Sequence, residues 1–591
     1  MKDLSLLSFI VSIGLLLAIA FFVEEQKGFL TAESLRLKKL LQLSMLIWFV
    51  TLVGTIFVEL ANILNTDLLG AFDSQVLRSF LQQTVIGRTY VAQLVFVLLA
   101  ILLGSRARKV GAIYWALAAS LLAAALPVFQ SHSSGLNNHS LAIGSLLFHI
   151  IFVSLWVGGV IGLLVVSPKV RAESLSRFSS LALWCAIAVS ASGAVNAFIR
   201  LNFAGAWHSA YSALVIAKVV FTGLLIAFGA QHRRYIIAKK PDQTFSLLGM
   251  EIVVMVITVA LGGWLSTLNP PEHPGVAGVQ PPPTLSRLIW SYSPDAIFLG
   301  ALILASALYI RGILLLQRRG DKWPIGRTIA FFCGVGFADY ATSGGIGIYS
   351  TYAFSYHMIA HMIIGMIAPI GFVLSAPITL ALRTLPIGRT HEERGIRGSL
   401  ITLIHSKAMG FYTNPVVVLA IFDGSLFLLY MTPLFETMMH SHAGHLLMNI
   451  HFLLAGYLFF HVIIGVDPNP RKVPHIVRII ILFAAMSVHA FFSIALLSTS
   501  TLLDGGYFAA LHRTWNTDLL VDQHLGGSIG WAMGEIPILL ALVATFIQWV
   551  RDDSREAKRI DRAAERAEAM GEDDELAEYN KYLAQLRSLD E

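Results

Sequence analysis

Long apolar stretches separated by short polar loops run along the whole of this chain. About fifteen of them extend for eighteen or more residues with few charges, the length at which a helix crosses the hydrocarbon core of a bilayer. The pattern predicts an all-α fold, a polytopic integral membrane helical bundle of about fifteen transmembrane helices.

Composition and charge agree with this pattern and add an orientation. Hydrophobic residues make up 56% of the 591 residues and charged residues 13%, with a mean hydropathy of +0.70. Lys and Arg gather in alternate loops, so the positive-inside rule places the N-terminus outside and the C-terminus in the cytoplasm. The net charge of +6 is spread over many short loops, which argues against nucleic-acid binding.

A proline-rich segment divides the chain into two predicted domains. Its composition favours an extended conformation that cannot span a membrane. We predict a domain of about eight helices over residues 1–268, an external linker over 269–294, a domain of about seven helices over 295–550, and a charged, solvated cytoplasmic tail over 551–591.

One apolar stretch carries two histidines at helical spacing. His357 and His361 stand four residues apart, so their side chains project from one face of a helix about one turn apart. Met358 and Met362 flank that face. A lone histidine in a bundle more often bonds to a neighbouring helix, but the paired spacing and the adjacent methionines reverse that preference. We predict that the pair shares an ion with a third ligand from another helix.

A second ligand-rich stretch lies between residues 431 and 451. His440, His442 and His445 fall within six residues at the predicted outer surface, so three imidazoles could converge on one ion; the alternative is a solvated loop without metal. Imidazole accepts either copper oxidation state and thioether sulfur selects Cu(I), so the two stretches together indicate copper. Further candidate ligands are His451, Met438, Met439, Met448, His489 and His524.

Three charged residues lie inside predicted transmembrane stretches. Lys218, Asp423 and Glu535 are costly there, so each is expected to face the bundle interior or an aqueous path. The sequence leaves open whether they line a permeation path or form ion pairs between helices.

Missing motifs limit the chemistry of the chain. Cys185 and Cys333 are the only cysteines and lie in different halves, so no C-x-x-C copper-chaperone motif occurs and copper would be held without thiolate. Neither G-x-x-x-x-G-K-[ST] nor D-K-T-G is present, so we do not expect an ATP-driven pump. We expect a transport protein rather than an enzyme. Transport would then follow a gradient, be coupled to another ion, or end in handover to a partner.

The N-terminal half resembles the CopD copper resistance family. Residues 145–165 read S-L-L-F-H-I-I-F-V-S-L-W-V-G-G-V-I-G-L-L-V, in which His149 is followed seven residues later by W-V-G-G. His132, in S-H-S-S, stands where the family often has a G-H-A-A turn. The resemblance covers residues 1–268 and implies that His149 and His132 take part in copper handling.

The C-terminal half resembles the CtaG family of caa3-type cytochrome oxidase assembly proteins. Separated motifs occur in the order of that family: H-M-I-A-H-M at 357–362, N-P-V-V at 414–417, H-A-F-F at 489–492 and D-Q-H-L-G-G at 522–527. The resemblance covers residues 295–550 and implies a role in oxidase assembly. A fusion of these two halves is similar to an arrangement found in actinobacteria.

Together these features predict a copper transport or handling protein of the bacterial plasma membrane. It would deliver copper, as Cu(I) or Cu(II), at the outer face for cytochrome c oxidase assembly or copper homeostasis. Its partner would be an oxidase subunit with a copper centre or a periplasmic or extracellular copper carrier. The alternative is a b-type haem electron carrier, with axial ligands drawn from His149, His357, His451 and His489.

Overall fold

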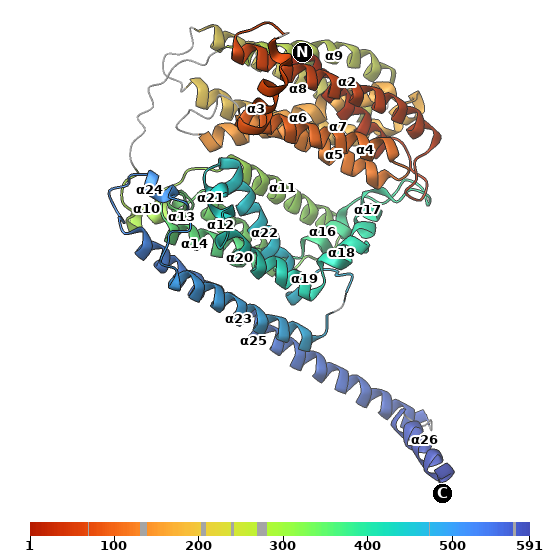
Figure 1. Cartoon of the computed structure of the whole chain (residues 1–591). Helices are drawn as coiled ribbons and strands as arrows, with labels where there is room; N and C mark the ends of the chain where they lie inside the picture. The colour runs from red at the N-terminus through yellow and green to blue at the C-terminus, as the bar shows by residue number, and fades with distance from the viewer. Residues whose placement is uncertain are drawn as a thin grey trace. The chain divides into compact units, whose positions relative to one another are not determined.

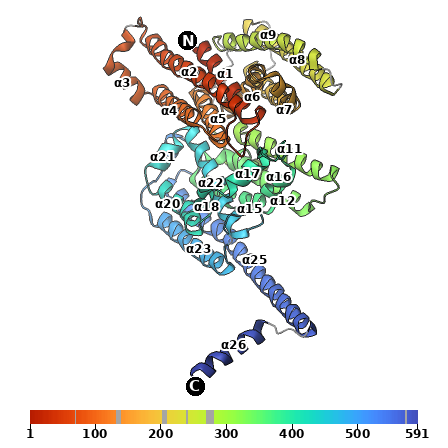
Figure 2. The same ribbon diagram turned by 90° about the vertical axis from the view of Figure 1, so that its right-hand side faces the viewer.

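Helices make up the fold, as the hydrophobic pattern predicted. The computed structural model describes residues 1–68, 70–130, 139–201, 209–237, 241–268, 280–471, 473–570 and 575–590. Within these ranges, β-structure is limited to isolated bridges. Figures 1 and 2 show the ribbon from two directions.

Thirteen helices in the described ranges are long and apolar enough to cross a membrane. The prediction of a polytopic all-α membrane protein is confirmed, with a count slightly below the predicted number of about fifteen. α12 (Ile325–Thr342) falls short because Arg327 and Asp339 make it less apolar. Residues Pro415–Tyr430 form a shorter apolar helix. The sidedness of the chain stays a prediction.

The chain packs into two compact units, and unit 1 comprises Met1–Trp323, Thr342–Ile348 and Leu380–Leu403. α1 packs against α2 and α6 within an apolar core. The crossing of α1 and α6 is close because two glycines meet there: a Cβ on Gly14 would lie 2.3 Å from the carbonyl oxygen of Gly158. The longer helices of unit 1 are α1 (Lys2–Leu17), α2 (Ala32–Leu64), α3 (Ser74–Gln83), α4 (Val85–Arg106), α5 (Val110–Ala125), α6 (His139–Val165), α7 (Pro168–Leu201), α8 (Ala210–Ile237), α9 (Pro241–Leu265), α11 (Ala296–Arg318) and α17 (Gly395–Ile404).

A buried carboxylate ties together a polar loop of unit 1. Glu393 accepts hydrogen bonds from Arg389 Nη2 at 2.9 Å and Nε at 3.0 Å, and Arg177 Nη1 lies 3.7 Å from its Oε1. Burial by itself raises the pKa of Glu393, but the hydrogen bonds from Arg389 and the charges of both arginines outweigh it, so the pKa is lowered. The ionised form of Glu393 therefore stabilises unit 1.

Unit 2 comprises Pro324–Ala341, Tyr349–Thr379 and Ile404–Glu591. α22 packs against η6 and α15, α25 packs against α14, and α23 and α25 run side by side (Figures 1 and 2). The elements of unit 2, besides α12, are α14 (Phe354–Met362), η6 (Ile363–Ile367), α15 (Ala368–Leu374), α18 (Lys407–Tyr412), α19 (Pro415–Leu419), η7 (Ala420–Gly424), α20 (Ser425–Tyr430), α21 (Leu434–Met439), α22 (His442–Ile464), α23 (His475–Ser498), α24 (Tyr507–Ala510), α25 (Leu519–Met570) and α26 (Glu575–Asp590).

Shorter elements complete the description. Unit 1 also contains η1 (Ala18–Phe22), η2 (Gly70–Phe72), η3 (Leu126–Gln130) and α10 (Leu285–Trp290), whereas α13 (Gly345–Ser350) and α16 (Pro377–Thr384) cross the limits between the units. α11 packs against α6, although it follows the proline-rich segment along the chain. The domain limits at residues 268 and 295 stay a prediction.

Candidate metal centre

The paired histidines lie on one short helix in the interior of unit 2. α14 presents His357 and His361 one turn apart, as their spacing predicted, with ring centroids 4.1 Å apart and ring planes inclined by 31°. The two residues are 0% and 1% exposed. The helical repeat therefore supplies two imidazoles to one buried point.

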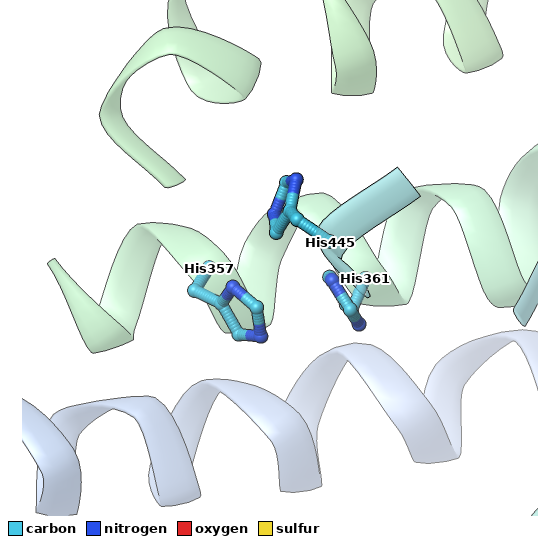
Figure 3. Close-up of side chains that lie close together, drawn as sticks. All are labelled: His357, His361 and His445. Carbon is cyan, nitrogen blue, oxygen red and sulfur yellow. The ribbon is translucent and has the colours of Figure 1, made fainter. Parts of the chain in front are cut away.

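A third imidazole reaches this point from another helix. α22 begins after Ser441, whose hydroxyl oxygen caps the helix by accepting a 3.0 Å hydrogen bond from the N–H of Gly444. His445 follows in the first turn, and its ring centroid lies 5.8 Å from that of His357 and 6.2 Å from that of His361. Figure 3 shows the His445 ring approaching the pair from its own helix. We call these three residues the triad.

The triad has the geometry and chemistry of a metal site. One nitrogen from each ring lies within 4.8 Å of the others. Two imidazole nitrogens that share one ion at about 2.0–2.1 Å are at most about 4.2 Å apart, so small side-chain rotations bring the triad to bonding distance. Both ring nitrogens of His361 and Nε2 of His445 have no hydrogen-bond partner among the described residues. Buried polar atoms of this kind are the exception in proteins, and a bound ion would satisfy them.

Aromatic side chains pack against the triad. The Phe435 ring lies 5.2 Å from that of His357, and Phe452 lies 4.6 Å from that of His361 in an edge-on contact. Tyr430 contacts His357 at 6.1 Å. His445 is only partly buried, so it forms the most accessible part of the triad. The Nε2 atom of His445 is itself buried.

A carboxylate from a distant part of the sequence fixes the start of α14. Asp522, in the first turn of α25, accepts hydrogen bonds from the N–H of Phe354 at 2.8 Å, the hydroxyl of Ser355 at 2.6 Å and the N–H of Ser355 at 3.4 Å. It therefore caps α14 in place of a residue next to the helix, and its charge favours the helix N-terminus. His357 lies within the turn that this cap holds.

Arg513 holds the capping carboxylate from the other side. Its Nη2 lies 3.6 Å from Oδ2 of Asp522, and its side chain is 3% exposed. Burial lowers the pKa of Arg513, while Asp522 and Asp504 act in the opposite direction. The guanidinium also donates to the carbonyl oxygen of Asn516 at 3.0 Å. The cap is thus part of a buried network.

The segment after the triad helix is also held closely. η6 is a π-helical turn that follows Met362, a distortion common near functional sites. There α22 approaches so closely that a Cβ on Gly456 would lie 1.8 Å from the carbonyl oxygen of Gly365. This contact fixes the helix of His445 relative to the helix of His361.

Most of the candidate methionines are buried. Met358 is fully buried, and its sulfur lies 3.4 Å from the position of a Cβ on Gly530 of α25. Met362 and Met448 are 3% exposed, Met439 is 5% exposed and Met438 is half-buried. Met358 therefore packs against α25.

The remaining histidines of the second stretch lie outside the triad. His440 is exposed, and its Nδ1 lies 2.8 Å from the carbonyl oxygen of Glu436. His442 and His451 are partly buried, and the His451 ring contacts Phe452 at 5.5 Å. The structure therefore selects His445 from the three neighbouring imidazoles.

Candidate residues farther away occupy separate places. His149 Nδ1 lies 3.1 Å from the hydroxyl of Ser192 in unit 1, where Lys218 packs against Gly262. His132 lies outside the described residues. In unit 2, His524 contacts the carbonyl of Thr499, Glu535 accepts a hydrogen bond from Trp531, and His489 faces Asp423.

Asp522 has a role that reasoning from the sequence did not assign. The sequence offered two signals: a carboxylate at the start of an apolar stretch and its place in the D-Q-H-L-G-G motif. Neither signal indicates which helix it caps, because its partner lies 168 residues away along the chain.

Family comparisons divide the chain in the same order as its motifs. Residues 3–138 match the copper resistance protein D-like N-terminal domain, residues 172–265 match copper resistance protein D, and residues 307–552 match the cytochrome c oxidase caa3 assembly factor. The triad lies in the third segment. No solved structure matched the chain significantly.

Relatives in mycobacteria share about half of the chain. Uncharacterized proteins of Mycobacterium bovis and Mycobacterium tuberculosis are each 40% identical over 305 residues, which covers 52% of this chain and 46% of the relative. A Mycobacterium leprae protein is 38% identical over the same length. The chain spans about half the length of the curated relatives it matches. It joins two segments of the copper resistance protein D type to a segment of the caa3 assembly factor type, which is the fusion that its motifs predicted.

Proposed function

We propose that this multi-pass membrane protein binds copper at the triad and delivers it for cytochrome c oxidase assembly. One observation carries the proposal: three imidazoles from two separate helices lie within 4.8 Å of one another in a buried site. That site falls within the segment that matches the caa3 assembly factor, while the preceding segments match copper resistance proteins.

The donor set supports copper, and in particular Cu(I). Imidazole suits copper, nickel, iron and zinc, and among divalent ions copper binds such sites most strongly. The triad contains no carboxylate, so a bound ion brings its full charge into a buried, aromatic surrounding. Charge is costly in such a place, so a neutral set of ligands favours the monovalent ion.

Delivery requires a site that exchanges its ion. The triad lacks thiolate, because Cys185 and Cys333 lie elsewhere in the chain, and thiolate would hold soft metals more firmly. His445 is the least buried residue of the triad. We propose that the N-terminal segments supply copper and that an oxidase subunit or an extracellular carrier receives it at the outer face of the plasma membrane. This role is transport and handover rather than catalysis.

Haem binding, the alternative function, is less well supported. Two imidazoles that ligate one haem iron must lie on opposite faces of a porphyrin. Of the candidate axial ligands, His357 packs against the rings of His361 at 4.1 Å and Phe435 at 5.2 Å, and His489 lies 3.4 Å from Asp423. A macrocycle would have to displace these rings.

The decisive experiment removes the pair. Replacing His357 and His361 with Ala should lower Cu(I) affinity by more than about 100-fold, because even residues that only support metal ligands change affinity by about 10–100-fold. His440→Ala is the matched control, since that ring is exposed and contacts a backbone carbonyl. Affinity would be measured by competition with a chromophoric chelator, together with oxidase activity and protein level in the membrane. Unchanged copper affinity in the double variant would refute the site.

A further inference from the structure

A second buried polar group in unit 2 lies apart from the triad. Asp423 sits in the π-helical turn η7, and His489 lies in the middle of α23. Asp423 Oδ1 and His489 Nδ1 are 3.4 Å apart, and the side chains are 1% and 0% exposed. A carboxylate and an imidazole thus meet in the apolar interior, where ionisable residues usually serve a function.

The outer atoms of this pair have no partner. Neither Oδ2 of Asp423 nor Nε2 of His489 makes a hydrogen bond among the described residues. Nε2 points toward α25, where a Cβ on Gly534 would lie only 2.1 Å away. Gly534 therefore leaves room for the imidazole. An ion pair that only joined two helices would not need a free basic nitrogen, whereas a proton acceptor oriented by a carboxylate does.

The other titratable groups on the helices that pack against η7 and α23 have contacts away from Asp423 and His489. α19 has none, and Tyr430 on α20 packs against Phe435. The groups on α22, α23 and the membrane part of α25 have the following neighbours: His442 beside His445, His445 in the triad, His451 on Phe452, Tyr457 stacked with His461, His475 on Asp552, Arg478 on the Val473 carbonyl, Asp522 on Phe354, His524 on the Thr499 carbonyl and Glu535 on Trp531. Asp423 and His489 thus face each other.

The charge of the pair depends on one proton. With the proton on either partner the pair is neutral overall, and without it the pair carries one negative charge. A second proton would leave an uncompensated positive charge in the interior, which is costly. The pair therefore alternates between a neutral and a singly negative state.

Aromatic contacts connect the pair to the triad. The ring of His357 contacts Tyr430 at 6.1 Å, Tyr430 contacts Phe492 at 5.6 Å, and Phe492 contacts His489 at 6.3 Å. The rings of His357 and His489 are thus less than about 18 Å apart. If the effective dielectric constant is about 20, a unit charge at one site changes the binding constant of a unit charge at the other by at least about fivefold over that distance.

We propose that Asp423 and His489 form a proton-binding pair that gives up its proton when the triad takes up Cu(I). The proposal rests on the proposed function. One positive charge enters unit 2 and one proton leaves for the surrounding water, so the buried charge stays constant and no electron is transferred. This exchange couples copper to a proton, which suits a chain that contains neither G-x-x-x-x-G-K-[ST] nor D-K-T-G.

The test compares Cu(I) affinity across a pH series for the full chain in lipid nanodiscs. Cu(I) would be added under anaerobic conditions and measured by competition with a chromophoric chelator. Protons compete with Cu(I) for the triad histidines equally in all variants. The ratio of wild-type affinity to Asp423→Asn affinity therefore reports only the contribution of the pair to copper binding. This ratio should start near one at low pH and rise at least about fivefold at high pH.

Two further variants make the outcome unambiguous. Asp423→Ser, which also removes the carboxylate, should give the same ratio, and it replaces Asp423→Asn if that variant does not fold. Glu535→Gln, which removes another carboxylate from the same unit, should follow the wild type. If the affinity ratio of wild type to Asp423→Asn stays constant with pH, or if Glu535→Gln gives the same pH-dependent ratio, the proposal of a proton-binding pair is refuted. Copper binding at the triad would still stand. If the wild type binds no Cu(I), the proposed function itself fails.

Discussion

Replacing Asp522 with Asn tests whether a remote cap sets the geometry of the triad. The change keeps the size of the side chain and removes its charge. In the wild type, the two carboxylate oxygens accept hydrogen bonds from Phe354 and Ser355 and face Arg513. An amide offers one acceptor and one donor, so one side of the cap loses its acceptor. Arg513 also loses its countercharge.

The expected cost follows from these contacts. Hydrogen bonds to a charged acceptor contribute about 1.5–3 kcal/mol, and neutral ones about 0.5–1.5 kcal/mol. Removing one partner of a buried ion pair costs about 3–5 kcal/mol when both are fully buried. Because Arg513 keeps its bonds to backbone carbonyls, we expect the start of α14 to lose about 2–4 kcal/mol of stabilisation. His357 lies in this first turn.

Copper affinity is the measurement that distinguishes positioning from general stability. Loosening the first turn of α14 should lower Cu(I) affinity by about 10–100-fold, the usual effect of losing a group that orients metal ligands. Asp467→Asn is the matched control. Asp467 caps α16 with the same three bonds, from the N–H of Ile378 at 3.0 Å and from the N–H and hydroxyl of Thr379 at 2.7 and 2.6 Å. It has no contact with the triad among the described residues.

Both variants should unfold at lower temperature than the wild type, and only Asp522→Asn should bind copper more weakly. If folded Asp522→Asn binds copper as tightly as the wild type, the view that the cap positions the triad is refuted. If Asp522→Asn and Asp467→Asn lose the same amount of copper affinity, the loss is due to general destabilisation of unit 2.

Three other perturbations test separate parts of the structure. Gly456→Ala should destabilise unit 2 by about 1–3 kcal/mol or more and weaken copper binding, because its methyl group would meet the carbonyl of Gly365. Thermal unfolding measures the loss of stability, and chelator competition measures the loss of copper affinity. Glu393→Gln should lower thermal stability at neutral pH, and the difference from wild type should vanish as the pH falls below the lowered pKa of Glu393; a difference independent of pH would contradict this. In a cysteine-free background, a cysteine at Thr437 should react with an impermeant maleimide from outside intact cells, and one at Ser554 only after permeabilisation; the reverse pattern would overturn the orientation.

Local regularities explain what the sequence could predict. Length and hydropathy fix transmembrane helices because a bilayer leaves few alternatives for the backbone. The spacing of His357 and His361 fixes their common face because the helical repeat is constant. The third ligand was predicted only as a residue on another helix, and its identity depends on how α22 packs against the segment of α14 and η6.

Tertiary contacts explain what the sequence could not predict. His440, His442 and His445 are equivalent by spacing, and the start of α22 after Ser441 decides which of them turns inward. The pairing of Asp423 with His489 was one of two interpretations left open for that carboxylate. Periodicity within one helix carries no information about either outcome, because both depend on the packing of separate helices.

The position of the methionines changes the argument for copper. Successive residues of a helix point about 100° apart, so Met358 cannot face the same direction as His357, and it packs against α25 instead. The proposed preference for Cu(I) therefore rests on the neutrality of three buried imidazoles and not on the sulfur of Met358. A site of neutral ligands is sensitive to nearby charge. For that reason we place the proposed regulation of copper release at the proton of Asp423 and His489.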